Sequence, residues 1–171
     1  MSDTLRDLIL PTCQGKTAFL GIGSIDREDD GVGVKCAGML IDAGVDHVFI
    51  GATVPEKIIP AIRDGGFDSI VLLDAVDAGS EPGAVMVCDA GEIENRFPQI
   101  STHKLSMSLL ERLLTDGNQA RVWLVGIQPQ SVERGRSELS GVVGETAALL
   151  ARSFEDCLSA TPSAIQEHLC M

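Results

Sequence analysis

Short apolar runs along the chain alternate with stretches in which apolar residues recur every three or four positions. Run 69–74 (SIVLLD) is apolar almost throughout, which is typical of a central strand covered on both faces. Four other runs are short and rich in β-forming residues. Together the predicted strands are 17–22 (TAFLGI), 47–51 (HVFIG), 69–74, 84–88 (AVMVC) and 121–127 (RVWLVGI).

The segments between these runs predict helices. A short helix is expected over 55–63 with an irregularity near Pro60, and a last helix over about 141–158. Ser101 and Thr102 are candidate N-caps for a leucine-rich helix that Asp116-Gly117 ends. The apolar positions at helical spacing are Val34, Ala37, Gly38 and Ile41, then Leu105, Leu109, Leu110, Leu113 and Leu114, then Val143, Ala147, Leu150 and Phe154.

Strands alternating with helices indicate an α/β fold, a three-layer sandwich with a twisted, mostly parallel five-stranded sheet between helices. The link between the third and fourth strands is too short for a crossover helix, so the fourth is expected to be antiparallel or an edge. We expect one domain over residues 1–171, with its core at about 15–158 and a loosely held tail at 159–171.

The composition excludes several classes of function. The 171 residues carry a formal charge of −12, which disfavours nucleic acid and anionic membrane surfaces as partners. Apolar runs are too short to span a membrane, and the N-terminus does not resemble a secretory signal. The five cysteines are scattered, without a C-x-x-C pair, so we expect a reduced, cytoplasmic protein.

The glycine-containing loop GIGSIDREDDGVG at 21–33 resembles a dinucleotide-binding loop at first sight. Asp26 stands where the third glycine of that motif is required, and the loop's four carboxylates would repel a pyrophosphate. A Rossmann-like nucleotide binder is therefore disfavoured, and we expect no nucleotide cofactor.

Carboxylates suit a cation instead. Asp30 follows the first strand and Asp74 ends the third, so both belong to the carboxyl edge of the sheet, while the loop before His103 can return there. Two carboxylates and an imidazole form a plausible site for a divalent transition metal. From the residues alone, zinc, nickel, iron or no metal remain open. Plainer roles are helix capping by Asp29 and Asp30, turn capping by Asp74 and Asp77, and a surface position for His103.

Five segments in register resemble the endopeptidases that mature the large subunit of nickel–iron hydrogenases, in the branch that serves hydrogenase 3-like, energy-converting enzymes. They are GIGSIDREDDGVG, ATVPE at 52–56, VLLDAVDAGSEPG at 71–83, STHKLSMSLL at 101–110 and LVGIQPQSVERG at 124–135. The resemblance implies the hydrogenase maturation protease-like (phosphorylase/hydrolase-like) fold. One departure is Ser24, where the family commonly has asparagine.

The resemblance also implies a site and a substrate. Asp30, Asp74 and His103 fall on the family's metal-binding positions, which are also the candidate catalytic residues here. The substrate would be a nickel-loaded large-subunit precursor, from which a C-terminal extension is removed. Nickel would be presented by the substrate, and zinc or cadmium could replace it in vitro. Asp29 and Asp77 are supporting candidates for a base in an aspartic or metal-assisted mechanism.

No catalytic nucleophile is evident, because Cys13, Cys36 and Cys88 lie in or beside predicted core elements. Two alternatives therefore stay open. In the first, the three ligands only verify that nickel is present while another group attacks. Alternatively, the protein is a non-catalytic nickel-sensing checkpoint module that binds the precursor without cutting it.

Overall fold

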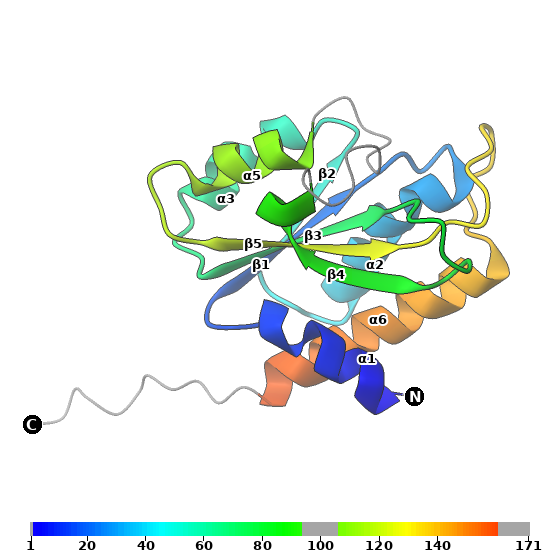
Figure 1. The fold of residues 1–171 in the computed structure, drawn as a ribbon, viewed down its shortest axis with the longest axis horizontal. Helices are drawn as coiled ribbons and strands as arrows, with labels where there is room; N and C mark the ends of the chain where they lie inside the picture. The colour runs from blue at the N-terminus through cyan, green and yellow to red at the C-terminus, as the bar shows by residue number, and fades with distance from the viewer. Residues whose placement is uncertain (1, 94–105, 161–171) are drawn as a thin grey trace, which may run out of the picture.

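A computed structural model describes residues 2–93 and 106–160 (Figure 1). The strands are β1 (Thr17–Ile22), β2 (Val48–Ala52), β3 (Ser69–Ala75), β4 (Val85–Asp89) and β5 (Arg121–Ile127). The α-helices are α1 (Ser2–Ile9), α2 (Val32–Asp42), α3 (Ile59–Arg63), α5 (Met107–Thr115) and α6 (Gly141–Ala160). Short 3₁₀ turns are η1 (Leu10–Thr12), η2 (Glu28–Gly31), η3 (Pro55–Lys57) and η4 (Ala90–Glu92).

The sheet has the order β2-β1-β3-β5-β4. All neighbouring strands are parallel except β4, which pairs antiparallel with β5 and forms an edge. The expected five-stranded, mostly parallel sheet is confirmed, and so is the antiparallel edge strand. The pairing aligns Gly21 with Leu73 and Asp74 with Gly126, so the carboxyl ends of β1, β3 and β5 meet at one edge.

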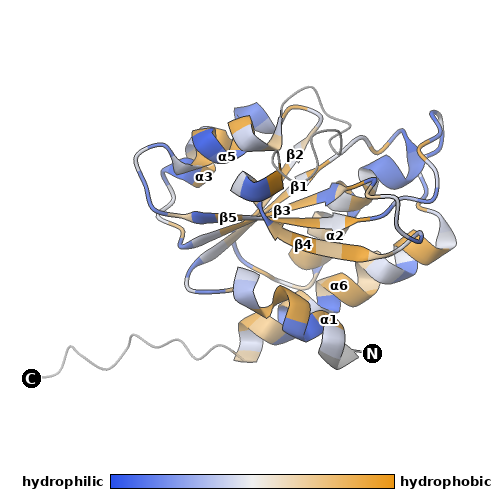
Figure 2. Cartoon of the chain, in the orientation of Figure 1, coloured by the Kyte–Doolittle hydropathy of each residue, from blue (hydrophilic) through white to orange (hydrophobic). Residues whose placement is uncertain are grey.

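Helices cover both faces of the sheet, which confirms the three layers. Alternating residues of each central strand point to opposite faces: Phe19 packs with α1, α2 and α6, whereas Leu20 packs with α3 and α5. Figure 1 shows α1 and α6 on one side of the sheet and α3 and α5 on the other, and Figure 2 shows the apolar strands between them.

Most predicted elements are confirmed to within a residue or two, but several details differ. The segment 55–63 is split into η3 and α3 at Ile58. Helix α5 begins after Ser106, whose hydroxyl accepts the Leu109 N–H, so it starts later than expected. The expected caps, Ser101 and Thr102, lie outside the described residues. In α2 the buried face contains Cys36 and Leu40, while Ile41 is 46% exposed.

The first helix was not foreseen. Ile9 and Cys13 are buried in the same cluster as residues of α2 and α6. The core therefore begins before residue 15, which was the expected start. At the other end of the chain, α6 continues to Ala160 and buries Cys157. The expected tail lies almost wholly outside the described residues.

Candidate functional site at the carboxyl edge of the sheet

Asp30 and Asp74 both lie at the carboxyl edge of the sheet, where the sequence placed them. Asp30 belongs to η2, which follows β1, and Asp30 is 2% exposed. Asp74 lies near the end of β3 and is 1% exposed. Burying a carboxylate is unfavourable unless it has polar partners or a cation. Two such groups at one edge therefore mark this region as the candidate site.

The loop between β1 and η2 holds Asp30 in place. Its Oδ2 atom accepts a hydrogen bond from the main-chain N–H of Ser24 at 3.2 Å. Gly23 has φ +135°, and a Cβ there would overlap the main-chain oxygen of Asp30, so only glycine fits. Because the Ser24 bond uses the main chain, replacing the family's asparagine by serine leaves it available.

The start of α2 lies directly against β3. A Cβ on Gly33 would overlap the main-chain oxygens of Leu73 and Ile22, so this glycine allows the helix to approach both strands. Gly33 is one helical turn after Asp30 and Leu73 precedes Asp74. The close approach therefore brings the two loops together at the edge. Asp74 itself accepts the N–H of Ala75 through Oδ1 at 2.8 Å.

Asp29 has a different function from its neighbour. Its carboxylate accepts main-chain N–H bonds from Gln130 at 2.8 Å, Ser131 at 3.1 Å and Ser140 at 2.8 Å, and the Ser140 hydroxyl donates at 2.8 Å. The expected capping of the next helix is not found, since α2 begins after Gly31 without a side-chain cap. Asp29 instead fastens the β5–α6 connection (residues 128–140) to η2.

Asp77 and Gln128 form a second hydrogen-bonded unit at this edge. Gln128 is buried; its Nε2 donates to Asp77 Oδ1 at 3.1 Å and its Oε1 accepts the N–H groups of Ala78 and Ser80. The hydrogen bond from Gln128, with a second from the Gly79 N–H, lowers the pKa of the exposed Asp77 carboxyl. Asp77 is therefore a weak base.

His103, the third predicted ligand, lies outside the described residues. Within residues 2–93 and 106–160, no three histidine, cysteine, aspartate or glutamate side chains are grouped so that they could hold a metal ion. Asp30 and Asp74 alone do not make a metal site, and the expected one depends on His103 or on groups from a substrate.

Buried cysteines do not supply the missing nucleophile. Burial raises the pKa of Cys13 to about 11 and that of Cys36 to about 12. Desolvation also raises the pKa of Cys157. Thiolates are the reactive form of cysteine, so these three side chains are unreactive near neutral pH.

Three residues of this edge were not singled out from the sequence: Glu28, Gln128 and Ser140. Gln128 lies in the GIQP segment that carries part of the family resemblance, so a signal was present. Glu28 and Ser140 gave none, because their role depends on contacts between η2 and the distant β5–α6 connection.

These features define an α/β protein with buried carboxylates gathered at one edge of its sheet. The profile of the family described as "Hydrogenase maturation protease" (HycI) matches residues 34–155. Over 119 residues the chain is 32% identical to Hydrogenase 3 maturation protease of Escherichia coli K12, covering 67% of this chain and 73% of that protein.

Solved structures agree. The solution structure of endopeptidase HycI from Escherichia coli has a TM-score of 0.72 at 25% identity, covering 82% of this chain and 90% of that one. The [NiFe] hydrogenase maturation protease HycI from Thermococcus kodakarensis KOD1 shares the fold, with a TM-score of 0.79 at 24% identity over 91% and 99% of the two chains.

The chain belongs to the hydrogenase maturation protease family. Its class is therefore that of an endopeptidase, a hydrolase of peptide bonds. Among the described helices, none is long and apolar enough to cross a membrane.

Proposed function

We propose that this protein removes the C-terminal extension of a nickel-loaded [NiFe]-hydrogenase large-subunit precursor. The observation that carries the proposal is the placement of two buried carboxylates, Asp30 and Asp74, at one edge of the sheet. Membership of the maturation protease family supports the reaction class. Nickel arrives with the precursor, so it is part of the substrate.

The donor set fits that cargo. Carboxylate and imidazole are ligands for divalent transition metals, and Asp30, Asp74 and His103 supply two of the first and one of the second. A protein that offers only part of a coordination shell binds a metal firmly only when the substrate completes it. The site thereby distinguishes loaded from empty precursor.

In this proposal, the nickel ion, with Asp30 and Asp74 as its carboxylate ligands, would activate the attacking water. Neither supporting candidate is a strong base: Asp29 uses both carboxylate oxygens in hydrogen bonds, and the pKa of Asp77 is lowered. A metal ion polarises a carbonyl and lowers the pKa of bound water, which supplies the chemistry that a nucleophilic side chain would otherwise provide. Asp77 and Gln128 then serve to hold the loop after β3.

The test is the intact mass of the large subunit from nickel-replete cells in three strains, carrying the unaltered protein, Asp74→Asn, or neither. We expect a shortened subunit only with the unaltered protein. A matched control is Asp68→Asn, which changes an exposed aspartate that accepts the Lys16 N–H at 2.7 Å, far from Asp74 along β3. Its strain should shorten the subunit normally.

Two results would reject parts of this proposal. Equal shortening in all strains means that another enzyme cuts, and the checkpoint module becomes the better explanation. Normal shortening by a folded Asp74→Asn variant would remove Asp74 from the mechanism.

A further inference from the structure

Glu28 is a buried acidic residue that the proposed reaction does not use. Its side chain is 10% exposed, and its backbone has φ +48°, a left-handed conformation that residues other than glycine rarely adopt. Strained positions of this kind persist where the surrounding structure holds them, and they gather at functional sites.

Hydrogen bonds hold the segments around Glu28 together. Its N–H donates to the main-chain oxygen of Arg136 at 2.7 Å, and the Gly135 N–H donates to the main-chain oxygen of Asp26 at 2.8 Å. The next residue, Asp29, ties the same connection down through four hydrogen bonds. η2 and the β5–α6 connection are thus held together by several hydrogen bonds.

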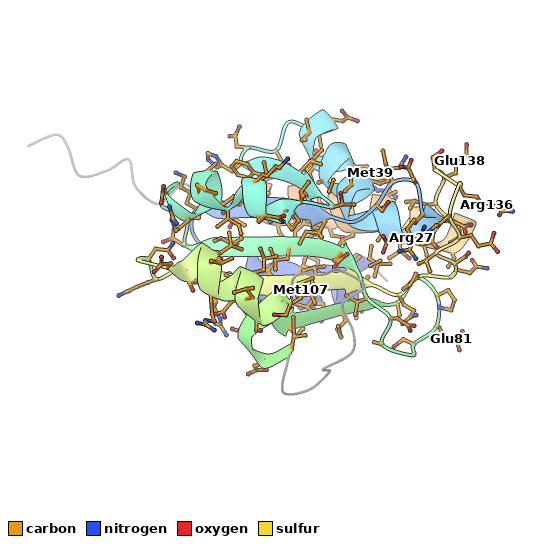
Figure 3. All side chains as sticks on the ribbon, turned by 90° about the horizontal axis from the view of Figure 1, so that it is seen from above. Arg27, Met39, Glu81, Met107, Arg136 and Glu138 are labelled. Carbon is orange, nitrogen blue, oxygen red and sulfur yellow. The ribbon has the colours of Figure 1, made fainter. Side chains whose placement is uncertain are left out.

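A cleft of about 440 Å³ opens between these two segments, lined by Glu28, Arg136, Ser137, Glu138 and Leu139. Its volume is in the range of pockets that hold small ligands. Figure 3 shows Arg136 and Glu138 at the same end of the molecule as Arg27. Glu28, which lines the cleft, is two residues before Asp30 in the chain and belongs to the same 3₁₀ turn.

The charges in the cleft favour a cation. Glu28 Oε2 is buried and makes no hydrogen bond within the described part of the chain, while Oε1 lies 3.8 Å from Arg136 Nη1. Arg136 is 66% exposed and its Nε also lies 3.5 Å from Glu133, so it is a weak, displaceable partner. Leu139 offers an apolar wall for the aliphatic stem of a long side chain.

We infer that this cleft binds a lysine or arginine side chain of the precursor, with Glu28 as the carboxylate that receives it. The inference rests on the proposed function, which makes a protein chain the substrate. A basic residue displaces Arg136 from Glu28 and sets the register of the peptide beside Asp30 and Asp74. An anionic group is disfavoured, because Glu28 and Glu138 both line the cleft.

The experiment measures the affinity of purified protein for nickel-loaded precursor, together with the rate of shortening in the same mixtures. Glu28→Gln keeps the shape of the side chain and removes its charge. We expect binding at least about 10-fold weaker, the loss typical of an unpaired buried charge partner, with a higher KM and little change in kcat. Glu133→Gln is the matched control: it also contacts Arg136 but does not line the cleft, so binding should be unchanged.

Two further variants keep the result decisive. Glu28→Gly suits φ +48° and should fold well, yet it should lose the same binding. Replacing the basic residues near the cleavage point by methionine, one at a time, should weaken binding to the unaltered protein at one position and add nothing to Glu28→Gln.

Equal binding by Glu28→Gln and Glu133→Gln would overturn the inference. If Glu28→Gln loses binding, and neither the unaltered protein nor any variant shortens the precursor, the subsite is upheld and the peptidase is rejected.

Discussion

The charged residues at the two ends of the sheet differ in how deeply they are buried. At the carboxyl edge, Glu28, Asp29, Asp30 and Asp74 are all buried. At the amino edge, a cleft of about 370 Å³ has charged and titratable lining residues as well, but Lys16, Asp46, His47 and Glu155 are exposed.

The exposed charges keep their hydration, whereas the buried charges need other interactions to replace it. Exposed groups keep their hydration and contribute little to stability. Buried carboxylates lose hydration, so the fold retains them only where hydrogen bonds or a ligand compensate. The Asp29 carboxylate accepts four hydrogen bonds inside the protein. Asp30 and Asp74 accept main-chain N–H bonds from Ser24 and Ala75, and we propose that they also contact a substrate-borne metal.

The largest effect is expected at Asp30. Asp30→Asn should reduce the rate of precursor shortening by at least about 100-fold, since contact with a catalytic metal is worth several kcal/mol. Its unfolding midpoint should stay near that of the unaltered protein, because an amide is easier to bury than a carboxylate. Cleavage assays with calorimetric unfolding check both. Full activity in the folded variant would contradict the proposed site.

Asp29 should show the opposite result. Asp29→Asn places an amide N–H₂ among N–H donors, and we expect the free energy of unfolding to fall by about 3–5 kcal/mol. Urea unfolding measures the loss, and the exposed Asp68→Asn should change stability by less than about 1 kcal/mol. A stable Asp29→Asn variant with normal loops would show that Asp29 is not the fastener of residues 128–140.

A third prediction concerns the approach of α2 to β3. Gly33→Ala should cost about 1–3 kcal/mol of stability, because its methyl group overlaps the oxygens of Leu73 and Ile22, and it should slow cleavage by moving Asp30. Gly38→Ala is the control in the same helix: among the described residues, none comes within 4 Å of a Cβ added there, so we expect a gain of about 0.5–1 kcal/mol. Similar stability changes in the two variants would reject the close-contact explanation.

Elements were predictable where local pattern decides them. Strand β3 is apolar nearly throughout because both faces are covered, and α6 shows its buried stripe in the spacing of Val143, Ala147, Leu150 and Phe154. The face of α2 was less clear, since it is apolar nearly all round and the close approach at Gly33 determines its orientation.

The sequence predicted only the part of the site that follows from the order of strands and loops along the chain. Position relative to the strands placed Asp30 and Asp74 at one edge, but only the family resemblance, and not the local pattern, separated Asp29 from Asp30. Their difference depends on Gln130, Ser131 and Ser140, which are remote in the chain. The cleft at Glu28 has the same origin: it exists only where η2 meets the β5–α6 connection.

The smallest effect is expected at the exposed carboxyl of Asp77. The hydrogen bond from Gln128 lowers its pKa below the ordinary value of 3.8, so the folded protein favours the ionised form. The stabilisation is fully present above the unfolded-state pKa and is lost as pH falls through the folded-state pKa. Asp77→Asn should therefore flatten the acid side of a plot of unfolding free energy against pH, because it lowers the free energy slightly at neutral pH and leaves it almost unchanged below the folded-state pKa. A slope equal to that of the unaltered protein would show that the Gln128 bond does not bias the ionisation of Asp77.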